Sequence, residues 1–240
     1  MRKTMILAAV LTVMGAASAL AQGIVVNKTD GTKVYFNASE VVSVTTFGYG
    51  EDGPHAPANA VAVDLGLPSG TKWANMNVGA EKPEDYGDYF AWGETKPKDV
   101  YIWETYIHWA GSAETCHDIG SDIAGEIDYD AATANWGSPW KMPTYEQCKE
   151  LIDNCTSEWT QENGIYGRKF TGPSGGTIFL PAAGTCGASG LGYAGSNGLY
   201  WSSTLHEFIS GSAYYLGIRS ETAYQQSEGQ RLGVTVRPVR

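Results

Sequence analysis

The sequence predicts an α+β domain in which one or two helices are followed by short antiparallel strands, with a small β-hairpin in front of it. Three observations lead to this class. The 240 residues include 30 Gly together with 8 Trp, 14 Tyr and 6 Phe, a composition typical of strands joined by glycine-rich turns and packed on large rings. Only residues 144–155 show a convincing amphipathic helical pattern after the N-terminal segment, and β-rich runs follow Cys155.

The charge balance excludes one class of partner. The chain has 16 basic and 26 acidic residues, a formal net charge of -10. A nucleic-acid-binding protein needs a surplus of Lys and Arg to meet the phosphate backbone. We therefore expect no nucleic-acid partner.

Residues 1–21 have the pattern of a secretory signal peptide. Arg2 and Lys3 precede a short apolar run, and Ala19 and Ala21 place an A-x-A cleavage motif before Gln22. The run is shorter than the roughly 20 apolar residues that span a bilayer, so we expect no transmembrane segment. The sequence thus predicts an exported protein in the periplasm, on the cell surface or outside the cell.

Residues 22–47 predict a small β-hairpin segment. Asp30-Gly31 separates two β-rich runs and favours the positive φ angles of a tight turn, and residues 41–47 predict a third strand. Residues 48–60 are rich in Gly, Pro and Asn and predict a linker. The remaining 61–240 is long enough for one domain.

Within that domain, Thr144 and Gln147 form a capping box that predicts a helix over 144–155. A weaker helix is expected over 129–135. Strands are expected over residues 167–171, 177–181, 199–204, 213–219 and 233–239. In the last of these the valines should point inward, leaving Arg237 or Arg240 for ion pairing.

Five blocks of sequence carry a family resemblance. They are VDLGLPSGTKWA (63–74), NVGAEKPEDYGDYFAWGE (77–94), NWGSPWKMPT (135–144), NGLYWSST (197–204) and VTVRPVR (234–240). Together they resemble the Fibrobacter major paralogous domain family, common in secreted proteins of gut Bacteroidetes. The resemblance covers nearly all of 61–240 and implies a C-type lectin-like fold, related to formylglycine-generating-enzyme-like domains. It also implies ligand binding or adhesion, although the family has no settled biochemical activity.

Catalytic signals are weak. No histidine has the H-E-x-x-H spacing of catalytic zinc, and the adjacent Cys116, His117 and Asp118 usually point apart. The resembled formylglycine-generating enzymes use paired cysteines near the end of the domain, whereas Cys186 is the last cysteine here. We therefore predict no enzymatic activity, with a formylglycine-generating-type enzyme as the alternative.

The four cysteines leave two alternatives open. Cys148 and Cys155 would lie about 10 Å apart on a continuous helix, too far for a disulfide. They would need Cys116 and Cys186 as partners, in either order. Otherwise some of the four stay free and buried as small apolar residues.

An acidic segment raises the question of a metal. It contains Asp118, Asp122, Glu126, Asp128 and Asp130. Carboxylates suit calcium, but the segment has neither an EF-hand spacing nor the calcium motifs of sugar-binding C-type lectins. We predict a solvated loop and no cofactor, with bound calcium as the alternative.

The predicted ligand surface lies between residues 184 and 233, where Tyr, Ser and Asn gather as in adaptable binding loops. We expect five exposed ligand-binding residues: Tyr193, Asn197, His206, Tyr224 and Gln226. The predicted function is recognition of a protein or glycan at the cell surface without a metal. A structural subunit of a surface assembly, docked through residues 24–47, is a further alternative.

Overall fold

The computed structural model describes residues 24–27, 33–36, 54–112 and 115–240, and the chain divides into two units, 1–53 and 54–240. In the first unit, β1 (Ile24–Asn27) and β2 (Lys33–Phe36) pair antiparallel. They lie in the segment predicted as a hairpin. The predicted signal peptide, the Asp30-Gly31 turn and the third strand over 41–47 lie outside the described residues.

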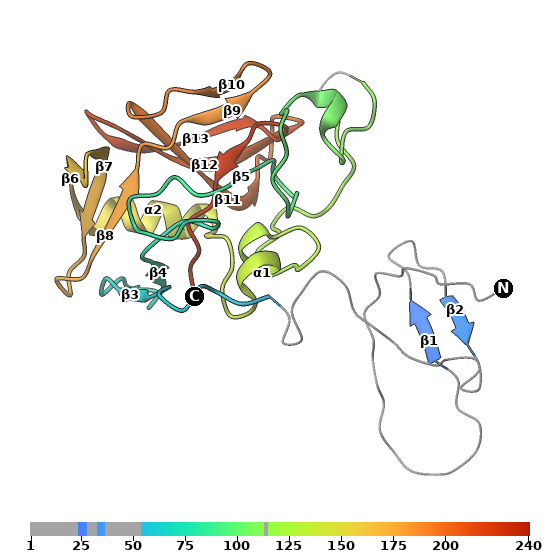
Figure 1. Ribbon diagram of the computed structural model, residues 1–240, viewed down its shortest axis with the longest axis horizontal. Helices are drawn as coiled ribbons and strands as arrows, with labels where there is room; N and C mark the ends of the chain where they lie inside the picture. Colours follow the sequence, from blue (N-terminus) through green and yellow to red (C-terminus); the bar gives the residue numbers. More distant parts are fainter. Residues whose placement is uncertain (1–23, 28–32, 37–53, 113–114) are drawn as a thin grey trace, which may run out of the picture. The chain divides into compact units, whose positions relative to one another are not determined.

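The second unit is an α+β structure with few helices and several antiparallel sheets (Figure 1). Its helical elements are η2 (Trp103–Thr105), α1 (Ala131–Trp136) and α2 (Tyr145–Asn154). Its strands are β3 (Ala62–Asp64), β4 (Lys72–Ala74), β5 (Tyr89–Phe90), β6 (Thr156–Glu162), β7 (Ile165–Thr171), β8 (Thr177–Pro181), β9 (Thr185–Gly187), β10 (Gly190–Gly192), β11 (Asn197–Leu205), β12 (Ser212–Arg219), β13 (Ala223–Gly229) and β14 (Val234–Thr235). No helix among the described residues combines the length and apolar character needed to cross a membrane.

The main sheet has five strands in the order β13-β12-β11-β14-β5. All neighbours are antiparallel except β11 and β14, which pair in parallel. The pairing of β11 with β12 shifts between Trp201 and Leu205, where the ladder is irregular. This sheet is the scaffold from which the loops after β11 and β13 emerge.

The two α-helices begin at side-chain caps. The Thr144 hydroxyl accepts from the backbone N–H of Gln147, and the side-chain oxygen of Gln147 accepts from the backbone N–H of Thr144. The predicted capping box of α2 is therefore confirmed. Asp130 caps α1 by accepting from the N–H groups of Ala132 and Thr133. The weaker predicted helix is therefore present, shifted to 131–136.

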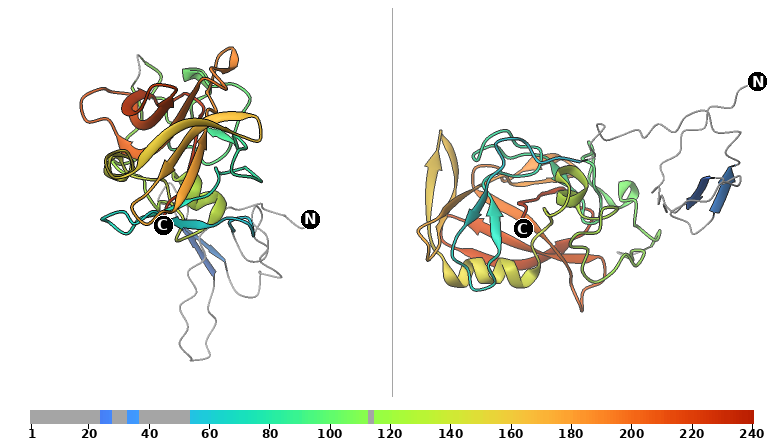
Figure 2. Two further views of the ribbon diagram at one scale, coloured as in Figure 1. Left: turned by 90° about the vertical axis from the view of Figure 1, so that its left-hand side faces the viewer. Right: turned by 90° about the horizontal axis from the view of Figure 1, so that it is seen from below.

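The helices pack on opposite faces of the main sheet (Figure 2). Side chains alternate along a strand, so Tyr200 enters the core cluster that includes residues of α2, and Trp201 enters the cluster that includes residues of α1. Both rings are fully buried. The rings of Trp73 and Trp92 are buried as well.

A second sheet, in the order β6-β7-β8, is built on a tight turn. Asn163 and Gly164 have φ angles of 50° and 84°, as in the type I′ turn that suits a two-residue hairpin loop. Asn163 Nδ2 donates to Oε1 of Glu84 at 2.7 Å, which attaches the hairpin tip to the rest of the unit.

The segment 233–239 departs from the strand predicted there. Strand β14 covers only Val234–Thr235, although the valines at 234, 236 and 239 are all buried as expected. The two terminal arginines differ in their surroundings. Arg240 is exposed, with its guanidinium carbon 5.0 Å from the ring centroid of Trp140.

Arg237 corrects the prediction of ion pairing. Its side chain is fully buried, and its guanidinium donates to Oδ1 of Asn77 (2.7 Å) and to the carbonyl oxygens of Ala74 (3.0 Å) and Phe179 (2.9 Å). All three acceptors are neutral. Burial lowers the pKa of Arg237 to about 10, which still leaves the group charged at neutral pH. The reason for the difference is the buried position of residue 237 among backbone carbonyl groups.

The second unit begins at Pro54, inside the segment predicted as a linker. Ala56 and Ala60 pack against a core cluster, and Asn59 Nδ2 donates to the carbonyl of Glu81 at 2.7 Å. Residues 54–60 are therefore part of the folded unit.

Candidate functional site

A cleft of about 440 Å³ opens between two segments, 116–120 and 205–211. We call it the His206 cleft. Its lining combines apolar side chains with histidine, carboxylate and amide groups. Residues lining it include Trp92, His117, Asp118, Ile119, Leu205, His206, Glu207, Phe208, Ile209 and Gln230.

Backbone pairing joins the two walls of the cleft. Asp122 forms an isolated antiparallel bridge with Thr204, and the N–H of Leu205 donates to the carbonyl of Ser121 at 2.8 Å. The segment that contains residues 116–120 is thus paired, through Ser121 and Asp122, with the irregular end of β11. This arrangement fixes the spacing of the walls in the folded protein.

His206 organises the second wall. Its Nδ1 lies 3.1 Å from the backbone nitrogen of Phe208 and 3.0 Å from that of Ile209, and it accepts both hydrogen bonds. An accepting Nδ1 carries no proton, so this geometry belongs to the neutral imidazole protonated at Nε2. The ring also packs on Tyr214, with centroids 4.6 Å apart.

The loop that His206 holds presents apolar side chains to solvent. Phe208 is 86% exposed and Ile209 is 49% exposed. A large exposed apolar side chain beside a cleft marks an interaction site more often than an isolated surface residue does. Because the loop backbone is bonded to His206, these side chains are displayed from a fixed position.

The opposite wall carries carboxylate and imidazole groups. The backbone N–H of His117 donates to the carbonyl of His108 at 2.7 Å, and Oδ1 of Asp118 accepts from Gly120 at 2.9 Å. Within the described part of the chain, neither Asp118 nor Glu207 forms a salt bridge. Among the described residues, these two carboxylates of the cleft therefore have no ion-pair partner.

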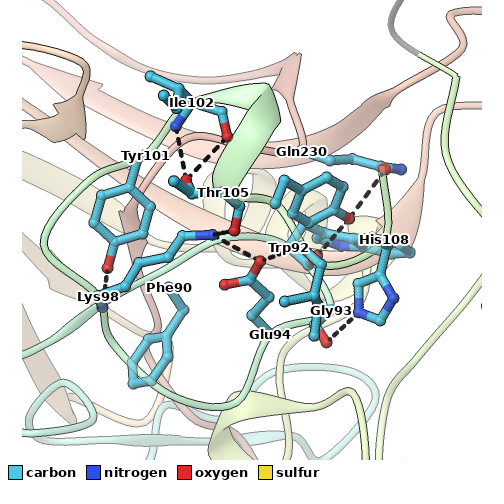
Figure 3. Close-up of polar contacts among 12 residues, drawn as sticks. Phe90, Trp92, Gly93, Glu94, Lys98, Tyr101, Ile102, Thr105, His108 and Gln230 are labelled. Atoms are coloured by element: carbon cyan, nitrogen blue, oxygen red, sulfur yellow. Dashed lines mark hydrogen bonds and ion pairs between the residues drawn. The ribbon is translucent and has the colours of Figure 1, made fainter. Parts of the chain in front are cut away.

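The wall behind the cleft is buried and hydrogen-bonded (Figure 3). The Tyr106 hydroxyl lies 2.8 Å from the carbonyl of Trp92 and 3.1 Å from Oε1 of Gln230. The indole N–H of Trp92 donates to the carbonyl of Ser202 in β11 at 2.9 Å. Trp92 and Gln230 are thus held in place where they line the cleft.

An ion pair between a partly buried lysine and a buried glutamate supports the same region. Lys98 Nζ lies 2.7 Å from Oε1 of Glu94 and donates to the carbonyl of Thr105 at 2.8 Å (Figure 3). Oε1 of Glu94 also accepts from the backbone N–H of Ile107 at 3.0 Å. The pair is therefore satisfied internally, so its role here is structural.

His108 lies in this wall in a buried setting. One ring nitrogen, Nε2, is 3.0 Å from the carbonyl of Gly93, and the ring contacts Tyr106 and Tyr129 edge-on. Burial lowers the pKa of His108, and the hydrogen bond to Gly93 opposes that shift to a smaller extent. A neutral imidazole donating from Nε2 satisfies the site.

The structure places only one predicted ligand-binding residue, His206, in the cleft. Tyr193 is 71% exposed and Asn197 half-buried, and the backbone N–H of Asn197 donates to the carbonyl of Tyr193 at 3.0 Å. Asn197 begins the nine-residue strand β11, whereas His206 follows its end. At about 3.3 Å per residue the two ends lie roughly 26 Å apart, so these residues do not form one site with His206.

The other two predicted residues lie on β13. Tyr224 is half-buried, because its ring covers Gly217 and lies 5.1 Å from the guanidinium carbon of Arg219. Gln226 is exposed, and its Oε1 accepts from the Tyr215 hydroxyl at 3.2 Å. Both residues lie on β13, an edge strand of the main sheet, and neither of them lines the cleft.

The acidic segment uses several of its carboxylates for local backbone bonds. Asp118 and Asp122 each accept from an N–H two residues ahead. Asp130 is fully buried and also accepts from Gly125 and Met142, in addition to its helix-capping bonds. Across the ranges that the structure describes, no group of three or more His, Cys, Asp or Glu side chains is placed to hold a metal ion.

The cysteines form no disulfide with one another, and all four lie within the described residues. Cys148 is fully buried, which agrees with the alternative of a small apolar core residue. Cys116, His117 and Asp118 all line the cleft. Burial raises the pKa of the Cys148, Cys155 and Cys186 thiols.

Sequence reasoning missed the two exposed large apolar residues of the cleft, Phe208 and Ile209. A signal was present, since two large apolar residues stand together in the polar stretch 206–212 between two β-rich runs. Trp92 and Gln230 gave no such signal, because only the fold brings them to the cleft.

Comparison with known proteins adds no relative. No family model, curated protein or solved structure matches the chain. A function must therefore be inferred from the geometry of the site and from the sequence itself.

Proposed function

We propose that this protein is an exported, non-enzymatic recognition protein that binds a protein or glycan ligand in the His206 cleft. We further propose that residues 54–240 adopt a C-type lectin-like fold and that the chain is related to the Fibrobacter major paralogous domain family. The five sequence blocks support the relationship, and the α+β architecture is compatible with it.

One observation carries the proposal. Phe208 is 86% exposed at the edge of a cleft, on a loop whose backbone is bonded to His206. An exposed ring on a fixed loop gives contact area with little further loss of conformational freedom on binding. Without a ligand, this exposure leaves a large apolar side chain in contact with water, which is unfavourable.

The chemistry of the cleft indicates which groups a ligand should present. Asp118 and Glu207 offer negative charge, while Ile119 and Phe208 offer apolar contact. A ligand with hydrogen-bond donors or a positive group beside an apolar portion complements this lining. Peptide side chains and sugars both meet that description.

The thiols support a non-enzymatic role over the formylglycine-generating alternative. A thiol must lose its proton to act as a nucleophile, and burial raises the pKa of Cys148, Cys155 and Cys186. Alkylation of the native protein at neutral pH tests this directly. Rapid modification of Cys116, which lines the cleft, would favour a thiol enzyme instead.

The decisive experiment is binding of the purified protein to an array of glycans and proteins, with calcium and with a chelator. The Phe208→Ala variant should lose at least tenfold in affinity for any specific hit, because its ring supplies the exposed contact. Ile107→Ala is the matched control, since Ile107 is 69% exposed and does not line the cleft.

Three outcomes would contradict parts of the proposal. Equal binding by Phe208→Ala and the unchanged protein would place the site elsewhere. A hit that the chelator abolishes would restore the calcium alternative for the acidic segment. The absence of any hit on the array would favour the alternative of a structural subunit.

A further inference from the structure

The β6–β7 hairpin carries an aromatic pair that lies far from the His206 cleft. The rings of Trp159 and Tyr166 have centroids 6.2 Å apart and planes inclined by only 14°. Figure 1 and the right-hand view of Figure 2 show the hairpin at one end of the second unit and residues 96–112 and 115–125 toward the other. The pair is therefore separate from the candidate site described above.

The strand register explains why these two rings lie together. The turn at Asn163-Gly164 places Gln161 opposite Tyr166 and Trp159 opposite Arg168. Side chains alternate along each strand, so all four of these residues share one face of the hairpin. Trp159 and Tyr166 are then diagonal neighbours, a spacing that aromatic side chains can bridge.

The base of the pair is held rigidly. Arg168 is buried, and its guanidinium donates to Ser157 Oγ at 3.0 Å and to the carbonyl oxygens of Arg219 (2.8 Å) and Ser220 (3.0 Å). Trp159 is half-buried and packs against a core cluster. A surface fixed in this way loses little entropy when a ligand binds to it.

The outer part of the pair is open to solvent. Tyr166 is 47% exposed, and Gln161 beside it is also exposed. The near-parallel planes are those of a stacked pair, so one face of each ring is directed toward its partner, and the 47% exposure of Tyr166 leaves ring surface of that residue open to solvent. The hairpin therefore presents flat aromatic surface next to an amide that both donates and accepts hydrogen bonds.

We propose that Trp159, Tyr166 and Gln161 form a second binding site, for a pyranose ring of a neutral saccharide. One face of a pyranose carries C–H groups that pack on an aromatic ring, while its hydroxyl groups project from the edge toward polar side chains. The net charge of -10 disfavours anionic ligands such as nucleotides at long range. This site is independent of the ligand proposed for the His206 cleft.

Isothermal titration calorimetry of the purified protein tests the proposal. The probes are cellohexaose, xylohexaose, mannohexaose and maltohexaose. We expect at least one of them to bind and the Tyr166→Ala variant to bind it at least tenfold more weakly. Tyr166→Phe keeps the ring and should stay within threefold of the unchanged protein.

Two further variants distinguish the hairpin site from the rest of the surface. Leu191→Ala removes a similarly exposed apolar side chain (49%) and should leave saccharide binding unchanged. Phe208→Ala separates the two sites, because a saccharide held at the hairpin keeps its affinity in this variant whereas one held in the His206 cleft loses it. Melting temperatures of all variants show that each is folded.

Each contrary result overturns the assignment. No binding of any of the four saccharides would exclude a neutral pyranose as the ligand. Saccharide binding that survives Tyr166→Ala but is lost in Phe208→Ala would assign the sugar to the cleft. If Tyr166→Ala abolished capture of a protein on the array but no saccharide bound, the hairpin would be a protein-binding surface.

Discussion

Nε of Arg237 donates to Oδ1 of Asn77 at 2.7 Å, across 160 residues of sequence. Both side chains are fully buried. The bond joins the segment after β14 to the loop before β5, and Asn77 also donates through Nδ2 to the carbonyl of Tyr86 at 2.8 Å. A charged side chain therefore acts here as an internal connector between neutral groups.

Arg237→Ala should strongly destabilise the folded state, by about 3 kcal/mol or more, since three buried acceptors lose their donor. Urea unfolding measures the loss. Arg240→Ala is the matched control and should cost at most about 1 kcal/mol, because Arg240 is exposed and makes a cation–π contact. Equal losses in the two variants would show that the buried hydrogen bonds contribute little.

His206→Ala should loosen the loop that carries Phe208. The substitution removes the acceptor for the N–H groups of Phe208 and Ile209, so these two amides should exchange with solvent faster. Hydrogen exchange measured by NMR reports both. His206→Asn retains a side-chain acceptor close to the backbone, so the two amides should be better protected from exchange in this variant than in His206→Ala. Unchanged exchange rates in His206→Ala would contradict the role given to the imidazole.

His108 should make stability depend on pH. Because burial lowers its pKa in the folded state, the unfolded chain binds a proton more readily. The stabilisation is present above the unfolded pKa of about 6.5 and is lost as pH falls below it, down through the lower folded-state pKa. His108→Gln should remove this part of the dependence.

The measurement is the free energy of unfolding of both proteins at pH 7.5 and pH 5. All other groups are present in both proteins, so the comparison isolates the contribution of residue 108. The unchanged protein should lose more stability than His108→Gln on acidification. A larger loss in the variant would reverse the sign and refute the assignment.

Thr144→Ala should cost about 1 kcal/mol, because the first turn of α2 loses its side-chain cap. Thr144→Ser keeps the hydroxyl and should cost much less. Chemical denaturation of the two variants gives the comparison. Should both lose the same amount, the effect would come from the methyl group and its packing.

Elements with strong local signals were predicted well. The capping box at Thr144 located α2, and β-rich runs located β7, β8, β11 and β12 to within a few residues. These signals are local because a cap or an alternating apolar pattern involves neighbouring residues only. The α+β class followed from them.

Elements without apolar alternation were missed. The sequences of β6 (TSEWTQE) and β13 (AYQQSEG) are largely polar, because each strand lies at the edge of its sheet. The Asn163-Gly164 turn was the available signal for the β6–β7 hairpin. Pairing with β7 and β12 stabilises β6 and β13, and the composition of these two strands alone does not indicate it.

The candidate site was predicted only in part for a similar reason. His206, one of the five predicted residues, lines the cleft, but Trp92 and Gln230 reach it through contacts between distant segments. The burial of Asp130 and Arg237 also depends on the assembled fold. The spacing of residues along the sequence does not predict such contacts between distant segments.

Strand β14 stands between β11 and β5 although it is the last described strand to be synthesised. Until residues 234–235 have left the ribosome, β5 has no neighbour in the main sheet, and Trp73 and Lys141 lack their bridges until Val239 follows. The main sheet therefore cannot be completed before residues 234–235 have been made. The sheet is thus completed by a strand that lies inside it, between β11 and β5, and not by one added at its edge.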